Sequence, residues 1–358
     1  MDAAAWLAAL AVLSALLLTE SGARLRTAVG SSPSAHALIV LALVGVARLP
    51  FAWYCGYRLE RQYELSQIRV REWVGGQAKT AAVAIVVALP LAELVYWAMR
   101  WPSAWWLVAA AGCAAVTGLL TAAGPVLVMP LLQQSRPVAR EVLCHRLERL
   151  SLRAGVPVLG VHELPLGERT RRASAALVGA GSTRRILLSD TLLSNYSDDE
   201  IEVVMAHEIG HHVHRHLLKA TIAEILLLLV GFRAAAAALD GSWQWLGLTS
   251  PWDVAGMPLM LIVVGAVLVA TTPLLNWWSR SQERRADRFA LENASQPAAF
   301  IDAVRRMSAQ NLAEDRPSSA AFLFFHTHPT AEERIAAARD VLGEMDRAPR
   351  LRAHRGGA

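Results

Sequence analysis

Residues 256–277 read Gly256-Met-Pro-Leu-Met-Leu-Ile-Val-Val-Gly-Ala-Val-Leu-Val-Ala-Thr-Thr-Pro-Leu-Leu-Asn-Trp277 and carry no charged side chain. As a helix, such a run is long enough to cross about 30 Å of hydrocarbon. A helix also satisfies its own backbone polar groups in lipid. Five further apolar runs lie at about 4–19, 36–54, 80–99, 104–128 and 217–239. The sequence therefore predicts a mainly α-helical, polytopic membrane protein with about six transmembrane helices.

The composition agrees with a membrane protein. Hydrophobic residues make up 54% of the 358 residues and charged residues only 18%, and the mean hydropathy is +0.33. Two ordinary globular domains of this total length would be less apolar. The first apolar run has no basic residue before it and no clear small-residue cleavage site after it. We therefore expect a retained membrane helix there, not a secretory signal.

The charge distribution predicts an orientation in the membrane. The net charge is +5, but the arginines are spread over segments that flank the apolar runs, which argues against nucleic-acid binding. Cytoplasmic loops of membrane proteins are enriched in arginine and lysine. With six spans, the basic segment 55–79, the polar region 129–216 and the chain from 278 onward fall on one side. We expect a multi-pass protein of the cell membrane with these regions in the cytosol.

The polar regions divide the chain into two predicted domains. Residues 1–128 form a membrane domain of four helices, and residues 129–358 form a second domain that a transmembrane hairpin at about 217–277 interrupts. Ser197, with Glu200 three residues later, has the signature of a capping box at a helix start. Residue spacing in the second domain predicts an amphipathic helix at 137–154, strands at 158–164, 173–178 and 185–188, and a helix from 201 to about 216.

The last of these helices contains the sequence His207-Glu-Ile-Gly-His211. Positions four apart on an α-helix are rotated by about 40°, so both imidazoles can bind one metal ion. A zinc ion with three protein ligands lowers the pKa of a water molecule in its open position, and Glu208 could take the proton from that water. So short a motif also arises by chance. Taken alone, it leaves a metal site and an ordinary helix equally open.

Glu283 is the best candidate for a third ligand. It follows the sixth apolar run, and Asp287 lies four residues later on the same face of a helix. Glu283 could bind the metal while Asp287 accepts a hydrogen bond from a ligand imidazole and fixes its tautomer. The alternative is a solvated ladder of charges with the neighbouring arginines. We favour a site for one zinc ion held by His207, His211 and Glu283.

Other histidines near the motif have less suitable positions. His212 lies about 140° around the helix from His207, and His216 is expected on the opposite face. His214 nearly eclipses His207, so it could support a ligand or replace one.

Two residues near the C-terminus could contribute to chemistry. The stretch His326-Thr-His328-Pro329 precedes Arg334, and a histidine and an arginine that return to the metal site could stabilise the oxyanion of a tetrahedral intermediate. From the spacing alone, an ordinary helix start with a proline near it is equally consistent.

Together these residues resemble the type I CAAX prenyl proteases and the related HtpX membrane proteases, which share a gluzincin catalytic domain. The matching pieces are His207-Glu-Ile-Gly-His211, the two apolar runs after it, Glu283-Arg-Arg-Ala-Asp287, His328-Pro329 and Arg334-Ile335. Residues 57–77, Ser189–Leu193 and the four leading helices favour the prenyl-protease branch. The resemblance implies a cytosolic zincin-type α+β catalytic domain with a small β-sheet. It also implies that His328 and Arg334 face the zinc or the substrate.

The resemblance also implies how a substrate would bind. The strand at 173–178 would be a sheet edge to which an extended peptide adds through main-chain hydrogen bonds. Ser174 and Ala175 would contact that peptide, in the position where the family usually has an Asn-Ala pair. The membrane domain has one helix fewer than in the longer family members.

We therefore expect an integral membrane zinc endopeptidase similar to CAAX prenyl proteases, with Glu208 as the general base. An HtpX-like quality-control protease of membrane proteins and a non-catalytic metal-binding membrane sensor are the alternatives, and the intact Glu208 argues against the sensor. A transporter is disfavoured because the polar motifs lie outside the apolar runs. The expected partners are the lipid bilayer and a peptide or protein substrate, prenylated or membrane-embedded. The sequence indicates no oligomeric state.

Overall fold

The computed structural model describes residues 2–101, 103–132, 135–165, 170–179, 181–312, 314 and 316–355. The chain divides into two compact units. Unit 1 comprises Met1–Leu120 and Ala220–Thr271, and unit 2 comprises Thr121–Lys219 and Thr272–Ala358. The division predicted from the sequence, at residue 128 with an interrupting hairpin, stays a prediction.

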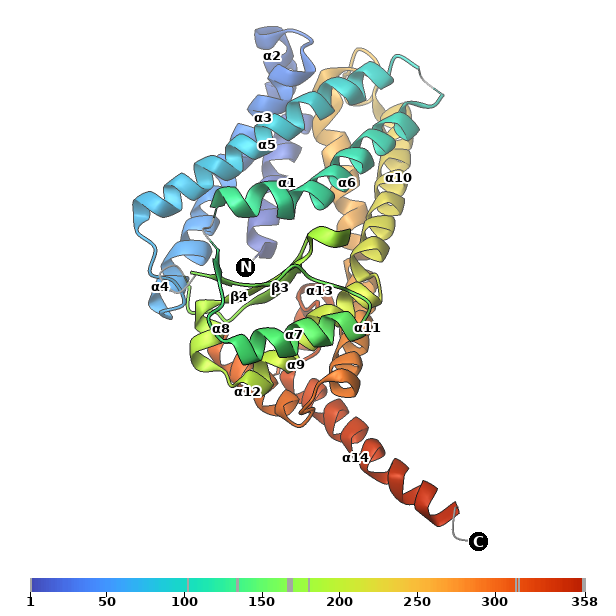
Figure 1. Ribbon diagram of the computed structural model, residues 1–358. Coiled ribbons are helices and arrows are strands. Elements are labelled where there is room, and N and C mark those ends of the chain that lie inside the picture. The colour runs from blue at the N-terminus through green and yellow to red at the C-terminus, as the bar shows by residue number, and fades with distance from the viewer. Residues whose placement is uncertain are drawn as a thin grey trace. The chain divides into compact units, whose positions relative to one another are not determined.

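Each of the six apolar runs forms a helix (Figure 1). The helices that contribute to unit 1 are α1 (Asp2–Leu18), α2 (Glu20–Val29), α3 (Pro33–Trp53), α4 (Glu60–Gln62), α5 (Val70–Ala98), α6 (Trp105–Leu132), α10 (His216–Ser242) and α11 (Met257–Asn293). A π-helical segment, Tyr54–Leu59, joins α3 to α4, and a 3-10 turn, Val254–Gly256, precedes α11.

Four described helical segments are long and apolar enough to cross a membrane: Pro33–Gln62, Val70–Ala98, His216–Ser242 and Val254–Asn293. Only 17% to 33% of the residues in their most apolar windows are buried within the protein, which leaves most of these surfaces for lipid. The pair Ala4–Leu18 and Ser21–Val29 adds a fifth span if it is counted as one, although it is bent by 76°. The predicted number of about six spans therefore stays a prediction, as does their orientation.

Small residues line the contacts between the helices of unit 1. Ala37 on α3, Ala98 on α5, Ala109 on α6 and Ala235 on α10 are all at most 5% exposed. Small side chains let helix backbones approach closely where lipid provides no hydrophobic drive for association. Unit 1 is thus held together by close packing of helices around one buried cluster.

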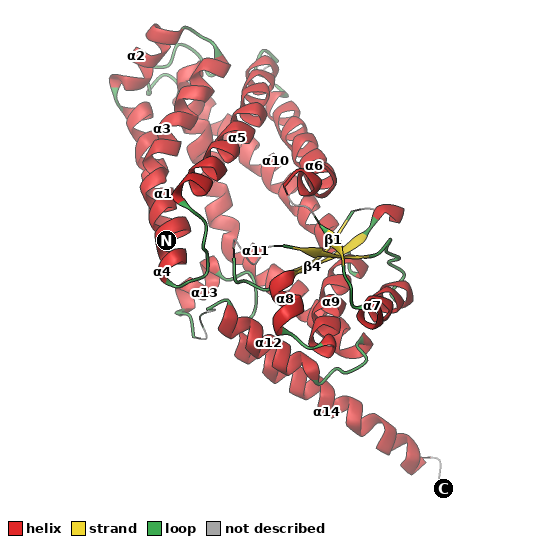
Figure 2. Ribbon diagram, turned by 60° about the vertical axis from the view of Figure 1, so that its left-hand side comes forward, coloured by secondary structure: helices red, strands yellow, loops and turns green. Residues whose placement is uncertain are grey.

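Unit 2 contains a small sheet and helices from both parts of its sequence (Figure 2). Its strands are β1 (Arg136–Pro137), β2 (Val161–Leu164), β3 (Ala175–Val178) and β4 (Arg185–Ser189). Its complete helices are α7 (Glu141–Arg153), α8 (Asp190–Asn195), α9 (Asp198–Val213), α12 (Ala299–Gln310), α13 (Ser319–Phe325) and α14 (Ala331–Arg355), with a 3-10 turn at Gly181–Thr183. The part of α11 from Thr272 onward, the end of α6 and the start of α10 also belong to this unit.

The sheet has the strand order β1-β2-β4-β3. β2 and β4 are parallel, and the other two pairs are antiparallel. Helices α7 and α9 lie on the same side of the sheet (Figures 1 and 2), and their buried leucines and isoleucines share one core with β4. Among the described strands, β3 pairs only with β4, so one edge of β3 is open.

Two helix boundaries differ from the prediction. The helix expected from residue 137 starts at Glu141, because Arg136 and Pro137 instead pair with β2 as strand β1. The helix expected to reach about His216 ends at Val213, because Arg215 adopts a left-handed conformation with φ of +53°. Such a conformation is uncommon for a residue with a side chain and cannot continue an α-helix. A new helix, α10, begins at His216.

Candidate active site

The start of α9 is fixed by the capping box that the sequence predicted. The Ser197 hydroxyl accepts a hydrogen bond from the Glu200 backbone N–H at 3.3 Å. The Glu200 carboxylate accepts one from the Ser197 N–H at 2.8 Å. This reciprocal cap sets where the helix begins. It therefore sets which face of α9 carries the imidazoles one and two turns later.

Gly210 explains how α9 can approach α11 so closely. A Cβ atom at this position would lie 3.2 Å from the Ala286 Cα atom and 3.2 Å from the Phe289 Cβ atom, both on α11. That is tighter than most real Cβ contacts. The glycine between the two imidazoles thus lets the helix that carries His207 and His211 pack against the helix that carries Glu283.

The three predicted metal ligands meet at one point within unit 2. The Nε2 atoms of His207 and His211 are 3.1 Å apart. The Glu283 carboxylate lies 3.3 Å from His207 Nε2 and 3.5 Å from His211 Nε2. Tetrahedral ligands about 2.0–2.1 Å from a zinc ion are about 3.3 Å from one another. The nitrogen and oxygen atoms therefore have the separations and the chemical character that a zinc ion requires.

Asp287 supports His207 from the other side of the ring, as its spacing suggested. Its Oδ1 atom lies 2.8 Å from His207 Nδ1. Arg334 donates to the same carboxylate through Nε at 2.9 Å and through a terminal nitrogen at 2.6 Å. A carboxylate on Nδ1 leaves Nε2 unprotonated toward a metal, and Arg334 fixes that carboxylate in place.

The electrostatics of the site favour a cation. Burial disfavours a charged His207, but the carboxylates of Asp287 and Glu283 outweigh burial and raise its pKa to about 9. Burial and the neighbouring His207 lower the pKa of His211 to about 4. One imidazole of this adjacent pair favours its protonated form and the other favours its neutral form, so the pair carries one positive charge. A divalent cation could take the place of that proton.

Glu208 and the predicted substrate residues line one cleft of about 510 Å³ beside these ligands. Burial raises the pKa of Glu208, although the charge of His207 opposes the rise. Ser174, just before β3, and Ala175, the first residue of β3, line the same cleft. The geometry therefore brings the predicted base, the strand edge and two of the three predicted ligands, His207 and Glu283, around a single cavity.

His328 and Arg334 also line this cleft. His328 Nδ1 lies 2.9 Å from the Glu283 carboxylate, and its side chain is 64% exposed. Arg334 is held by Asp287, and the nearby carboxylates raise its pKa further despite burial. Their proximity is a finding, whereas their role toward an oxyanion stays a prediction.

The expected position of His216 is wrong. Because α9 stops at Val213 and the chain turns at Arg215, the His216 ring lies against the ligand His211, with their Nδ1 atoms 2.8 Å apart. His214, considered as a replacement ligand, is not in the three-residue metal group and stacks on His216 with ring centroids 5.5 Å apart.

The sequence also gave no indication of the cleft wall on α12. Phe300, Val304 and Met307 of this helix line the cleft, and Asn311 lies directly after the helix. Their apolar spacing could have identified an amphipathic helix. Nothing local in the sequence, however, points α12 toward α9.

The sequence matches two family models. Residues 139–342 match peptidase family M48, and residues 5–134 match the CAAX prenyl protease N-terminal region, described as five membrane helices. The resemblance inferred from the motifs is thus confirmed.

Three relatives illustrate the range of the match. Uncharacterized metalloprotease YhfN of Bacillus subtilis is 28% identical over 308 residues, covering 83% of this chain and 71% of the relative. The CAAX prenyl protease 1 homolog of Dictyostelium discoideum is 26% identical over 301 residues, covering 81% of this chain and 68% of the relative. The protease HtpX homolog of Nostoc punctiforme is 28% identical over 288 residues, covering 74% and 96%.

The crystal structure of S. mikatae Ste24p has a similar fold, with a TM-score of 0.77 and 22% identity over 86% of this chain and 76% of that chain. The predicted fold class, a mainly α-helical membrane protein with a small sheet, is confirmed. The M48 match covers more than half of the chain and includes both helices that carry His207, His211 and Glu283. The chain therefore belongs to the membrane metallopeptidases of peptidase family M48.

Proposed function

We propose that this protein is an integral membrane zinc endopeptidase in which His207, His211 and Glu283 hold the metal and Glu208 is the general base. The observation that carries the proposal is the mutual separation of 3.1–3.5 Å among the three ligand atoms. Two of these residues come from α9 and the third from α11, which is remote in sequence. A solvated ladder of surface charges would not converge in this way.

Bound zinc would polarise the scissile carbonyl and make water a better nucleophile near neutral pH. Glu208 takes one proton from the attacking water while the water oxygen bonds to the carbonyl carbon. The carboxyl group then gives that proton to the leaving amine nitrogen as the C–N bond breaks. The raised pKa of Glu208 suits this role, because it brings the carboxyl closer to the working pH. His328 and Arg334 would stabilise the negative charge that develops on the carbonyl oxygen.

The substrate would be an extended peptide that adds to the open edge of β3, with Ser174 and Ala175 in contact with it. A prenylated or membrane-embedded protein is the proposed class, since the chain matches the CAAX prenyl protease N-terminal model over residues 5–134. The site would face the cytosol from the cell membrane, as the positive charge of residues 55–79 and 129–216 suggests.

A quality-control protease of membrane proteins is the second candidate. The observation in its favour is that the match spans 96% of the Nostoc punctiforme protease HtpX homolog but 68% of the Dictyostelium discoideum CAAX prenyl protease 1 homolog.

Glu208→Gln tests the proposal directly. The purified variant should retain zinc at the wild-type level and lose cleavage by at least about 10²-fold, because the amide cannot accept the proton. Glu148→Gln, on the partly exposed surface of α7, is the matched control and should behave as wild type. Both proteins are assayed in detergent on a farnesylated peptide and on an unfolded membrane protein, which separates the two candidate functions. Wild-type protein that binds zinc but cuts neither substrate would instead favour the metal-binding sensor.

A further inference from the structure

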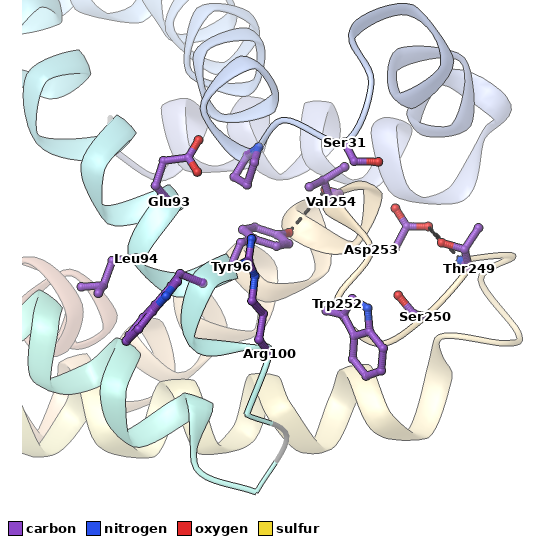
Figure 3. Close-up of a pocket in the computed structure, with 12 residues that line it drawn as sticks. Ser31, Glu93, Leu94, Tyr96, Arg100, Thr249, Ser250, Trp252, Asp253 and Val254 are labelled. Atoms are coloured by element: carbon purple, nitrogen blue, oxygen red, sulfur yellow. Dashed lines mark hydrogen bonds between the residues drawn. The ribbon is translucent and has the colours of Figure 1, made fainter.

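A second cavity, of about 720 Å³, lies entirely within unit 1, where α3 and α11 begin and α5 ends. Its wall combines aromatic and charged side chains, including Glu93, Tyr96, Arg100, Trp252 and Asp253. Figure 3 shows these side chains: Glu93 and Tyr96 belong to α5, Arg100 follows the end of α5, and Trp252 and Asp253 lie in the loop before α11. Neither the metal site nor the proposed peptide cleft includes any of them.

Tryptophans indicate that this cavity opens at the boundary between lipid and water. Trp97, Trp101 and Trp252 are 45%, 53% and 53% exposed, and they lie where apolar helices end or begin. Tryptophan is enriched at the level of lipid headgroups, because its ring is apolar and its N–H is polar. A ligand in this cavity would therefore have access to the headgroup region of a membrane.

Asp253 forms a fixed part of the wall and its charge is already balanced. Its side chain accepts hydrogen bonds from the backbone and hydroxyl of Thr249, both at 2.8 Å, and from the Ala255 N–H at 3.0 Å. It also forms an ion pair with Arg26 on α2. The side chain is only 1% exposed. This network holds the loop against the helices and adds no net charge to the cavity.

Glu93 and Arg100 supply one unbalanced charge of each sign. The Oε1 atom of Glu93 accepts from the Ser34 N–H at 3.0 Å and from its hydroxyl at 2.5 Å, while Oε2 has no partner among the described residues. Arg100 forms no ion pair with any residue that the structure describes, and its side chain extends into the cavity (Figure 3). Arg100 lies in the turn directly after α5, which ends at Ala98, and both Glu93 and Arg100 line this one cavity. A ligand could therefore reach both charges.

We propose that this cavity binds the zwitterionic headgroup of a phospholipid that carries a primary ammonium group. The Arg100 guanidinium donates to the phosphate oxygens, a geometry for which its planar fork is suited. The ammonium group donates to the free Oε2 atom of Glu93. A choline headgroup has no N–H donor for this carboxylate, and a glycerol headgroup has no positive charge. The acyl chains would extend along the lipid-facing helices past the exposed tryptophans.

The proposal is tested by lipid capture. Protein stripped of lipid in detergent is mixed with equal amounts of phosphatidylethanolamine, phosphatidylcholine and phosphatidylglycerol, and retained lipid is identified by native mass spectrometry. Wild type should retain phosphatidylethanolamine about tenfold more than either competitor, and Arg100→Gln and Glu93→Gln should each remove this preference. Arg71→Gln, at the opposite end of α5, is the control and should retain it.

Four results would overturn the proposal. Equal retention of phosphatidylcholine would exclude recognition of the ammonium hydrogens, and equal retention of phosphatidylglycerol would exclude a role for the Glu93 charge. If Arg100→Gln unfolds at the wild-type temperature and still prefers phosphatidylethanolamine, this cavity would be excluded as the binding site. If soluble glycerophosphoethanolamine displaces the lipid at equal concentration, the proposal that the ligand is a membrane lipid would be wrong.

Discussion

His212 Nε2 lies 3.1 Å from the carbonyl oxygen of Leu177, so the helix that carries both candidate metal-binding histidines also contacts the edge strand of the sheet. A carbonyl only accepts hydrogen bonds, so His212 donates from Nε2. Burial lowers the pKa of His212 and keeps the ring neutral. Besides carrying the two candidate metal ligands, α9 therefore determines which part of β3 is free for another strand.

The hydrogen-bond pattern of β3 specifies which groups are free. The Ser189 N–H donates to the Ser174 carbonyl at 2.9 Å, which makes this a hydrogen-bonded pair. The backbone N–H and C=O groups of successive residues in an antiparallel strand point alternately toward and away from the paired strand. The backbone groups of Ala175 and Leu177 therefore point away from β4. Because His212 occupies the carbonyl of Leu177, Ala175 is the residue of β3 with both outward groups available beside the cleft.

His212→Ala should therefore lengthen the edge available to a peptide. In wild type, KM should stop falling once a peptide series is long enough to pair with Ala175. In the variant, peptides that reach Leu177 should gain one hydrogen bond, worth about 0.5–1.5 kcal/mol, and KM should fall about two- to tenfold further. The measurement is KM against peptide length, with extensions on either side of the cleaved bond.

His145→Ala is the control for this series, because His145 is an exposed histidine on α7. Its length profile should match that of wild type. His212→Ala could bind zinc and cut peptides with the same dependence of KM on peptide length as wild type. In that case the inference that a substrate peptide pairs with the edge of β3 is wrong, while the proposed peptidase function stands.

Asp287→Asn should weaken zinc binding without removing a ligand. The amide no longer stabilises the Nδ1–H of His207 with a full charge, and it leaves Arg334 without its carboxylate partner. Loss of such a supporting carboxylate typically lowers metal affinity by about 10–100-fold. Titration with a competing zinc chelator measures the change. Glu292→Gln, an exposed residue on the same helix that pairs with Arg288, should leave the affinity unchanged.

Local spacing explains why the sequence alone could predict which residues meet at the candidate metal site. His207 and His211 share one helix, and so do Glu283 and Asp287, so helical geometry fixes each pair. The position of His216 could not be predicted in this way. It depends on the left-handed conformation of Arg215, a position where the sequence has neither glycine nor asparagine to signal a helix end.

Long-range packing explains why the sequence could not predict several other features of the fold and the site. Arg136 forms part of β1 only because β2 lies beside it, and no local preference favours a strand of two residues that ends in proline. The α12 wall of the cleft, with Phe300 and Met307, likewise depends on where α12 packs in the folded chain. The bond between His212 and Leu177 joins residues 35 positions apart. Spacing within one element contains none of this information.

Removal of the metal should abolish activity but leave unit 2 folded. The core of this unit is formed by α7, α9 and β4, whose buried leucines and isoleucines do not involve the three ligands. After dialysis against a chelator, peptide cleavage should disappear and the far-ultraviolet circular dichroism should be unchanged. Added zinc should restore cleavage. Loss of secondary structure on chelation would contradict the expectation and make the metal a structural requirement.

Glu202→Ala should destabilise unit 2 more than any exposed charge substitution on α9. The Glu202 side chain is 1% exposed, forms an ion pair with Arg146 on α7, and accepts hydrogen bonds from the Ser295 N–H at 3.1 Å and its hydroxyl at 2.7 Å. Removal of one partner of a buried pair leaves the other charge uncompensated and typically costs about 3–5 kcal/mol. Because Arg146 is 21% exposed and keeps Asp199 as a partner, we expect about 2–3 kcal/mol here.

Asp199→Ala is the matched comparison for this prediction. Asp199 pairs with the same arginine, but its side chain is 45% exposed. Exposed pairs contribute about 0–1 kcal/mol, because water screens them and competes for the same hydrogen bonds. Thermal unfolding in detergent should therefore show a clear fall in midpoint for Glu202→Ala and almost none for Asp199→Ala. Equal shifts would mean that burial does not govern the strength of this network, and that Arg146 is held as firmly by the exposed carboxylate as by the buried one.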